Sequence, residues 1–298
     1  MIGTMPLFGA RVRCGSIRYV RSMVAISVEL TEVFEWNGSI VRWSKFGSGS
    51  PVVVCHGTPW SSLVWRSTID VLKQNHAVYV WDMIGYGQSD KPDADVSLAT
   101  QGALLAALVG QWNLNSPDVV AHDYGGAVAL RAHLLHGMPV GSFVLVDIVA
   151  LRPWGSPFFR LVAQNADVFV ALPSNLHEAL LREYIRGASA RGLAQVVLDE
   201  LVAPWLHEGQ AAFYRQIAQA DERFTAEIEL HYVDIQSPTL IVWGTADQWI
   251  PVDRAMRLAD AIPNSTVLLI EGAGHLVQED NPAELNAAIS QWLADRAR

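Results

Sequence analysis

The chain has 298 residues, a length that allows one or two domains. Its formal net charge is −9, from 21 Lys and Arg against 30 Asp and Glu, and no stretch forms a basic stripe. This balance argues against binding to nucleic-acid backbones and to anionic membrane surfaces. Hydrophobic residues make up 51% and charged residues 17% of the chain, a composition that supports a large buried core and excludes a disordered chain.

Cysteine content and apolar runs indicate the cellular setting. The two cysteines, Cys14 and Cys55, make no disulfide framework and favour a reducing compartment. The longest apolar runs fall short of the roughly 18 residues that cross a bilayer. Residues 1–22 carry four arginines and no acid, without the apolar core of a secretory signal. We therefore expect a cytoplasmic protein in which residues 1–22 are a flexible extension, or in which Met23 is the natural start.

Apolar runs typical of strands alternate with helical patterns along most of the chain. Short continuous apolar runs suit strands that are buried on both faces. The alternation predicts an α/β fold with a mostly parallel, doubly wound sheet flanked by helices. The predicted strands cover 26–36, 40–46, 52–55, 77–81, 119–121, 143–146, 239–243 and 267–270, and the predicted helices 61–74, 98–112, 125–136, 252–261 and 283–297.

The alternation stops between residues 151 and 236. This stretch shows helical patterns at 175–186, 193–201 and 209–219 and no buried strand. It predicts a helical cap inserted after the sixth strand, between core segments 23–150 and 237–298. A cap in this position would cover the crevice at the carboxyl ends of the strands, where ligands bind in such sheets.

The segment Ala121-His122-Asp123-Tyr124-Gly125-Gly126 joins a predicted strand to a predicted helix. A nucleophile elbow needs small residues around its central residue, because the turn leaves no room for side chains. The central residue here is Asp123, which we predict to be the nucleophile. The alternative is an ordinary Asp that caps the following helix.

Two further loops complete a candidate catalytic site. His56-Gly57-Thr58-Pro59 follows the strand at 52–55, where an oxyanion loop is expected, although it could be a simple Gly/Pro turn. The predicted oxyanion donors are the backbone N–H groups of Thr58 and Tyr124. His275 follows the last strand and is the predicted general base.

The acid that orients His275 has two candidates. Asp247 follows the strand at 239–243, and Asp147 follows the strand at 143–146. Both lie at carboxyl ends of strands, where sites form. We favour Asp247, with Asp147 as its substitute or structural partner.

Four segments resemble the α/β-hydrolase superfamily: residues 54–65 (VCHGTPWSSLVW), residues 81–92 (WDMIGYGQSDKP), the HDYGG elbow and the Gly-Ala-Gly-His of 272–275. The resemblance implies the α/β-hydrolase fold. The Asp at the elbow resembles the aspartate-nucleophile branch, which includes haloalkane dehalogenases, epoxide hydrolases and fluoroacetate dehalogenases.

An Asp nucleophile implies attack on a saturated carbon. A carboxylate is already ionised at neutral pH and can displace a leaving group directly, giving an alkyl–enzyme ester. Water activated by His275 would then attack the Asp123 carboxyl carbon, with the oxyanion held by the Thr58 and Tyr124 amides. This chemistry needs no cofactor and no metal.

The enzyme families of this branch differ in the side chains that stabilise the leaving group. Haloalkane dehalogenases typically bind the halide with a Trp directly after the nucleophile and with an Asn in the HG-x-P motif or a second Trp. This chain has Tyr124 directly after the nucleophile and Thr58 in the HG-x-P motif. Halide donors would then have to come from tryptophans near the site or in the cap: Trp60, Trp154 or Trp205.

Epoxide hydrolases deliver a proton from cap tyrosines. Tyr214, in the segment Ala211–Arg215, resembles one of them, although it could equally be a packing aromatic. Tyr184 is an unplaced second candidate. Fluoroacetate dehalogenases carry arginines just after the nucleophile, and here the first is Arg131, so that activity is not expected.

These observations favour an epoxide as substrate, with a haloalkane as the alternative by the same mechanism. Ester or lactone hydrolysis by general-base water attack, and a non-catalytic ligand-binding role, are further alternatives. The expected partners are a small apolar organic substrate and water, with neither nucleic acid nor membrane. Of the 11 tryptophans, Trp60, Trp154, Trp205 and Trp249 are expected to line an apolar pocket.

Overall fold

A computed structural model describes residues 28–296 of the chain; the predicted extension over 1–22 lies outside them. Its centre is an eight-stranded sheet in the order β1-β2-β4-β3-β5-β6-β7-β8. The pairs β1–β2 and β2–β4 are antiparallel, and all other neighbours are parallel. The strands are β1 (Glu32–Trp36), β2 (Ser39–Phe46), β3 (Ser50–Cys55), β4 (His76–Trp81), β5 (Asp118–His122), β6 (Phe143–Val146), β7 (Thr239–Gly244) and β8 (Ser265–Ile270).

The mostly parallel sheet that the apolar runs predict is confirmed. Central strands are buried on both faces, and all six residues of β7 are buried. The first strand is shorter than predicted, because β1 begins at Glu32 and residues 26 and 27 lie outside the described part. Asn37 and Gly38 both have positive φ, 49° and 81°, as a type I′ hairpin turn requires.

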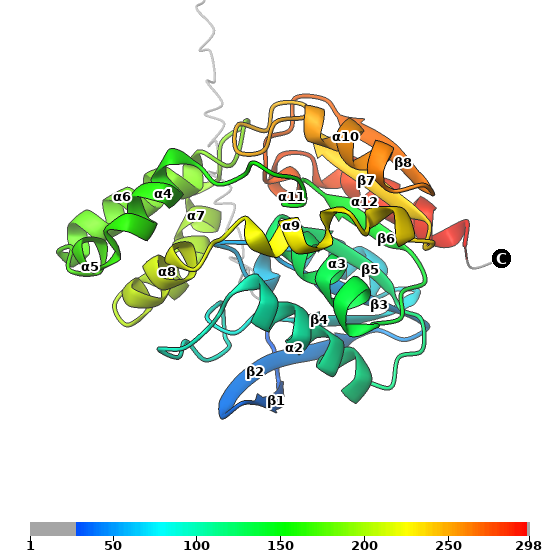
Figure 1. The fold of residues 1–298 in the computed structure, drawn as a ribbon, viewed down its shortest axis with the longest axis horizontal. Helices are drawn as coiled ribbons and strands as arrows, with labels where there is room; N and C mark the ends of the chain where they lie inside the picture. Colours follow the sequence, from blue (N-terminus) through cyan, green and yellow to red (C-terminus); the bar gives the residue numbers. More distant parts are fainter. Residues whose placement is uncertain (1–27, 297–298) are drawn as a thin grey trace, which may run out of the picture.

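Helices cover both faces of the sheet (Figure 1). On one face α1 packs against α12; on the other α2 packs against α3, and α3 against α9. The core helices are η1 (Ser62–Trp65), α1 (Arg66–Leu72), α2 (Leu98–Gln111), α3 (Tyr124–His136), α10 (Asp253–Ala261), α11 (Val277–Asp280) and α12 (Pro282–Ala294).

The chain between β6 and β7 is helical and contains no strand. Helices α4 to α8 gather to one side of the sheet (Figure 1), and we call this group the cap. Helix α9 instead returns to the core, where Glu227 pairs with the buried Arg131 of α3 at 2.8 Å. The elements are α4 (Pro157–Gln164), α5 (Ala166–Val170), α6 (Ser174–Arg186), α7 (Gln195–Val202), η2 (Ala203–Trp205), α8 (Gly209–Ala218), α9 (Arg223–Glu229) and η3 (Tyr232–Asp234).

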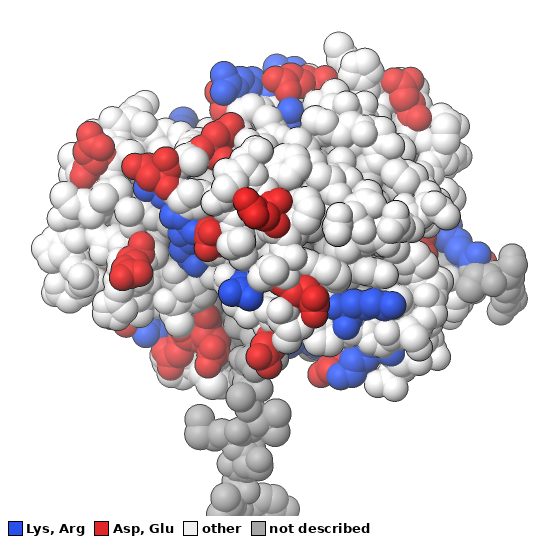
Figure 2. All heavy atoms as spheres, turned by 90° about the horizontal axis from the view of Figure 1, so that it is seen from below, with Lys and Arg blue, Asp and Glu red and all other residues white. Residues whose placement is uncertain are grey.

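The surface shows no segregation of charge on the face drawn in Figure 2, where basic and acidic side chains adjoin one another. None of the helices within residues 28–296 combines the length and the apolarity that a membrane crossing requires.

Candidate active site

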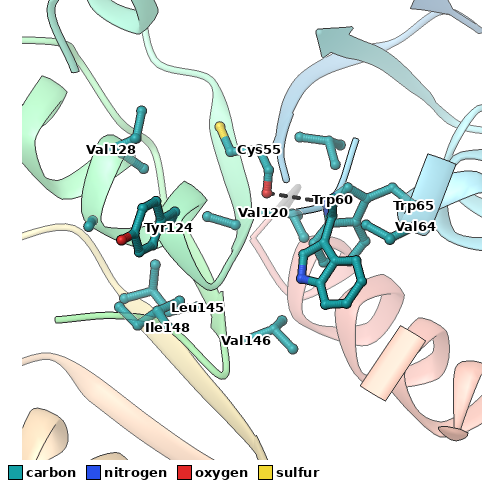
Figure 3. Close-up of a cluster of buried hydrophobic side chains, with 14 of the residues drawn as sticks. Cys55, Trp60, Val64, Trp65, Val120, Tyr124, Val128, Leu145, Val146 and Ile148 are labelled. Carbon is teal, nitrogen blue, oxygen red and sulfur yellow. Dashed lines mark hydrogen bonds between the residues drawn. The ribbon is translucent and has the colours of Figure 1, made fainter. Parts of the chain in front are cut away.

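The site begins with the pairing of two neighbouring strands. β3 and β5 run parallel, with Cys55 opposite Ala121, so the residues that follow them emerge at the same edge of the sheet. The strands are fixed there by an apolar cluster that flanks β5 on two sides (Figure 3). The indole N–H of Trp65 donates to the carbonyl oxygen of Cys55 at 3.2 Å. This anchoring lets the Thr58 backbone N–H donate to Oδ2 of Asp123 at 2.6 Å.

Asp123 lies on a sharp turn between β5 and α3. Its φ is 50° and its ψ −122°, a conformation that non-glycine residues rarely adopt. A Cβ on Gly125 would lie 2.5 Å from the carbonyl oxygen of His56, and one on Gly126 would lie 2.3 Å from Ile148. The Asp123 side chain makes no capping hydrogen bond to α3, which counts against the capping interpretation.

Burial sets the ionisation of Asp123. Desolvation raises the pKa of this carboxyl to about 6. The positive charge of His275 and the backbone N–H groups of Thr58 and Tyr124 act in the opposite direction, because they stabilise the carboxylate. The two N–H groups are the predicted oxyanion donors, and both face this side chain.

His275 is held between two carboxylates. Its Nδ1 pairs with Oδ2 of Asp247 at 2.9 Å, and its Nε2 lies 3.8 Å from Oδ1 of Asp123. The other Asp247 oxygen accepts the N–H groups of Trp249 and Ile250, at 2.7 and 3.0 Å. Burial lowers the pKa of His275, but the charge and hydrogen bond of Asp247 and the charge of Asp123 outweigh it and raise the pKa above its ordinary value.

Asp147 forms no hydrogen bond or ion pair with His275; the partners of His275 are Asp247 and Asp123. It is fully buried at the end of β6, where its Oδ1 accepts the Gly244 N–H at 2.9 Å. Burial, followed by the charge of Asp247, raises the pKa of Asp147 well above its ordinary value. The structure therefore brings Asp247, rather than Asp147, to the histidine.

A cavity of about 360 Å³ opens in front of Asp123, within the range of small-molecule sites. Its buried end consists of Thr58, Asp123 and Tyr124, and the cap contributes Tyr184 from α6. Its remaining lining consists of Val149, Pro153, Trp154, Gly155, Ser156, Pro157, Phe159, Gln248, Trp249, Ile250, Pro251 and Arg254.

The four tryptophans expected in the pocket divide into two pairs. Trp154 and Trp249 line the cavity, whereas Trp60 and Trp205 do not. The Trp154 indole N–H donates to Thr225 at 2.8 Å, and that of Trp205 donates to the Pro59 carbonyl at 2.7 Å. Trp60 is buried and stacks on Trp249, with ring centroids 5.7 Å apart. The Trp60, Trp154 and Trp205 N–H groups are therefore poorly placed to bind a halide in the cavity.

The two cap tyrosines differ in their position relative to the cavity. Tyr214 is absent from the cavity lining, and its hydroxyl pairs with Nδ1 of His177 at 2.9 Å inside the cap. Tyr184 lines the cavity, and burial together with the charge of Asp123 raises its pKa well above the ordinary value. Its hydroxyl therefore keeps its proton at neutral pH. The Tyr124 hydroxyl is buried without a hydrogen-bond partner in the part of the chain that the structure describes.

Sequence reasoning did not identify the residues that support the Thr58 side chain. Its hydroxyl donates to Oε1 of Gln216 at 2.6 Å, and the Tyr86 hydroxyl donates to the same oxygen at 3.0 Å. Tyr86 belongs to the 81–92 segment, which gave a usable signal, whereas no pattern marks Gln216 on α8. Within residues 28–296, no three His, Cys, Asp or Glu side chains form a group that could hold a metal ion.

Residues 52–288 match the model of the Alpha/beta hydrolase family. The chain belongs to this family and is a hydrolase. The crystal structure of an alpha/beta hydrolase fold protein from Burkholderia ambifaria is 47% identical in sequence, with a TM-score of 0.86, and the match covers 88% of this chain and 97% of that one.

Two more distant structures share the fold. The epoxide hydrolase CorEH is 21% identical with a TM-score of 0.76, over 90% of this chain and 99% of its own. The haloalkane dehalogenase DatA from Agrobacterium tumefaciens C58 is 22% identical with a TM-score of 0.78, over 89% of this chain and 96% of its own. At these identities the similarity establishes the architecture alone.

The crowding around the elbow gives a stability prediction. Gly125→Ala should lower the free energy of unfolding by about 1–3 kcal/mol, because its Cβ would overlap backbone oxygens that cannot rotate away. Gly110→Ala in α2 is the matched control: its Cβ meets nothing within 4 Å, so stability should rise by roughly 0.5–1 kcal/mol. Urea denaturation measures both, and a Gly125→Ala protein as stable as the wild type would contradict the close packing.

Proposed function

We propose that this hydrolase opens epoxides through a covalent ester on Asp123 and needs no cofactor. The observation that carries the proposal is the arrangement around the Asp123 carboxylate. Its Oδ2 is held by the Thr58 N–H, and its Oδ1 faces His275, which is in turn fixed by Asp247. A buried carboxylate with one oxygen held and one free is arranged to attack carbon.

In the first step, Oδ1 of Asp123 attacks an epoxide carbon and forms a C–O bond. The epoxide C–O bond breaks, and its electron pair moves to the ring oxygen. Tyr184 donates the proton that this oxygen needs, since its hydroxyl remains protonated and lines the same cavity. The product of the step is a hydroxyalkyl ester of Asp123.

In the second step, Nε2 of His275 removes a proton from water, and the oxygen of that water attacks Cγ of Asp123. Negative charge develops on Oδ2, where the N–H groups of Thr58 and Tyr124 stabilise it. The ester bond then breaks, His275 returns its proton to the departing alkoxide, and a diol leaves. The proton left on Asp123 restores Tyr184.

The ester itself prepares His275 for this second step. Part of the rise in the His275 pKa comes from the negative charge of Asp123, and esterification removes that charge. The imidazole therefore loses its proton more readily once the intermediate has formed. A general base works best when it is neutral at the moment water must be activated.

The haloalkane alternative would use the same nucleophile, base and oxyanion donors. It also needs N–H donors that converge on a halide. The indoles of Trp154 and Trp205 donate elsewhere, and Trp60 lies outside the cavity lining. A tyrosine of the cap, Tyr184, by contrast, lines the cavity. This difference supports the epoxide.

His275→Gln should block the second step and leave the first intact, because the glutamine cannot act as a base. We expect the Asp123 ester to accumulate and turnover to fall by about 10²–10⁴. Mass spectrometry of the quenched protein after reaction with styrene oxide detects the ester.

In a single turnover of the wild type in oxygen-18 water, the label should enter Asp123 first; label found in the diol alone would contradict the covalent route.

The cap tyrosines give a paired test. Tyr184→Phe should slow epoxide opening roughly a hundredfold, since it removes the proton donor at the cavity. Tyr214→Phe should leave the rate within about twofold and cost about 1 kcal/mol of stability through its lost bond to His177. Single-turnover kinetics measure the rates. The reverse order of effects would assign the acid to Tyr214.

Ester formation should depend on pH through Asp123. The carboxylate is the reactive form, and burial raises its pKa to about 6. The rate of ester formation should therefore be constant above this pH and fall about tenfold per unit below it. Rapid-quench measurement of ester formation in the His275→Gln variant isolates this step. Removing His275 also removes one stabilising charge, so in that variant the decline should begin at a higher pH.

A further inference from the structure

The cavity that contains Asp123 has an arginine at its outer end. Arg254 lies in the first turn of α10 and is half-buried beside residues 153–157 and 248–251, most of which are exposed. Asp123 lies at the buried end of the same cavity. Among the residues that line it, Asp123 is the only acid and Arg254 the only base.

Arg254 has no acidic partner within residues 28–296. Among the described side chains, the ion pairs involve other arginines, lysines and histidines. Its guanidinium donates instead to the backbone carbonyls of Arg152 and Pro153, at 3.0 and 3.2 Å. These bonds use two of its five N–H donors and fix the group against the cavity rim. The remaining donors are available to a ligand.

The chain as a whole carries a net charge of −9. The surrounding potential repels anions, so an anionic ligand needs a local cation at the cavity. A planar guanidinium with free N–H groups matches a carboxylate in shape and charge. The same cavity is lined by the aromatic side chains of Trp154, Phe159 and Trp249, which suit an apolar body.

We propose that Arg254 is a specificity residue that selects substrates bearing a carboxylate at the end remote from the reacting carbon. The inference rests on the proposed function for the position of the reacting carbon. The bound substrate would place its apolar body against the aromatic walls, its carboxylate at Arg254 and its epoxide at Asp123. The proposal narrows the small apolar substrate expected from the sequence analysis to an amphipathic acid.

The kinetic test compares two substrates of similar body, styrene oxide and its para-carboxy derivative. Arg254→Gln should lower kcat/KM for the carboxylated substrate at least about tenfold and leave the neutral one within about twofold. Arg254→Lys keeps the charge and should recover part of the loss. Equal effects on both substrates, or none on either, would overturn the proposal.

Arg160→Gln is the matched control. Arg160 also donates to a rim carbonyl, that of Gly155 at 2.9 Å, but it does not line the cavity. This variant removes the same charge and a comparable backbone contact, so it should leave kcat/KM unchanged for both substrates. A loss of the carboxylated substrate equal to that in Arg254→Gln would assign the effect to net charge or to the rim, against the proposal.

A binding measurement separates this inference from the proposed reaction. Isothermal titration calorimetry with phenylethanediol and its para-carboxy derivative needs no turnover. Wild type should bind the carboxylated diol more tightly, and Arg254→Gln should abolish the difference. This result would support the carboxylate site even if neither epoxide were hydrolysed. Failure to hydrolyse either epoxide would overturn only the proposed epoxide reaction. Equal affinity of the wild type for the two diols would overturn the site.

Discussion

The parallel pairing of β3 with β5 is the constraint on which the site depends. It brings the Thr58 amide to 2.6 Å from a carboxylate that the strained turn after β5 holds in place. Neither loop could form this contact alone, because Thr58 and Asp123 are 65 residues apart in the chain. The cost of burying a carboxylate is offset here by amide dipoles and a nearby imidazole. The core beneath the two strands therefore determines the chemistry above it.

The same contacts also distribute charge among four ionisable groups. Burial and the charge of Asp247 raise the pKa of Asp147, whereas Asp123 and Asp247 lie on either side of the His275 imidazole. Asp247 accepts hydrogen bonds from two backbone N–H groups and pairs with His275, while burial raises the pKa of Asp123 to about 6. The proposed nucleophile and the proposed orienting acid are thus the same residue type in two environments.

Much of the fold could be predicted from the sequence, because strands buried on both faces leave continuous apolar runs and the loops after them follow directly. That logic also placed Asp123, Thr58 and His275 at one edge of the sheet. It favoured Asp247 as the orienting acid but kept Asp147 as an alternative, because both follow strands and the outcome depends on which loop reaches the imidazole. It could not orient the cap, because a helix pattern for α6 or α8 does not say whether Tyr184 or Tyr214 faces the cavity.

The stacking of Trp249 has a consequence for observing the enzyme. Its ring lies nearly parallel to that of His275, with centroids 5.0 Å apart, and also stacks on Tyr184 of the cap at 4.6 Å. A protonated imidazole in contact with an indole quenches its fluorescence, whereas a neutral one does so far less. The emission of Trp249, isolated as the difference from a Trp249→Phe protein, therefore reports the charge on His275 and the position of α6 in a single optical signal.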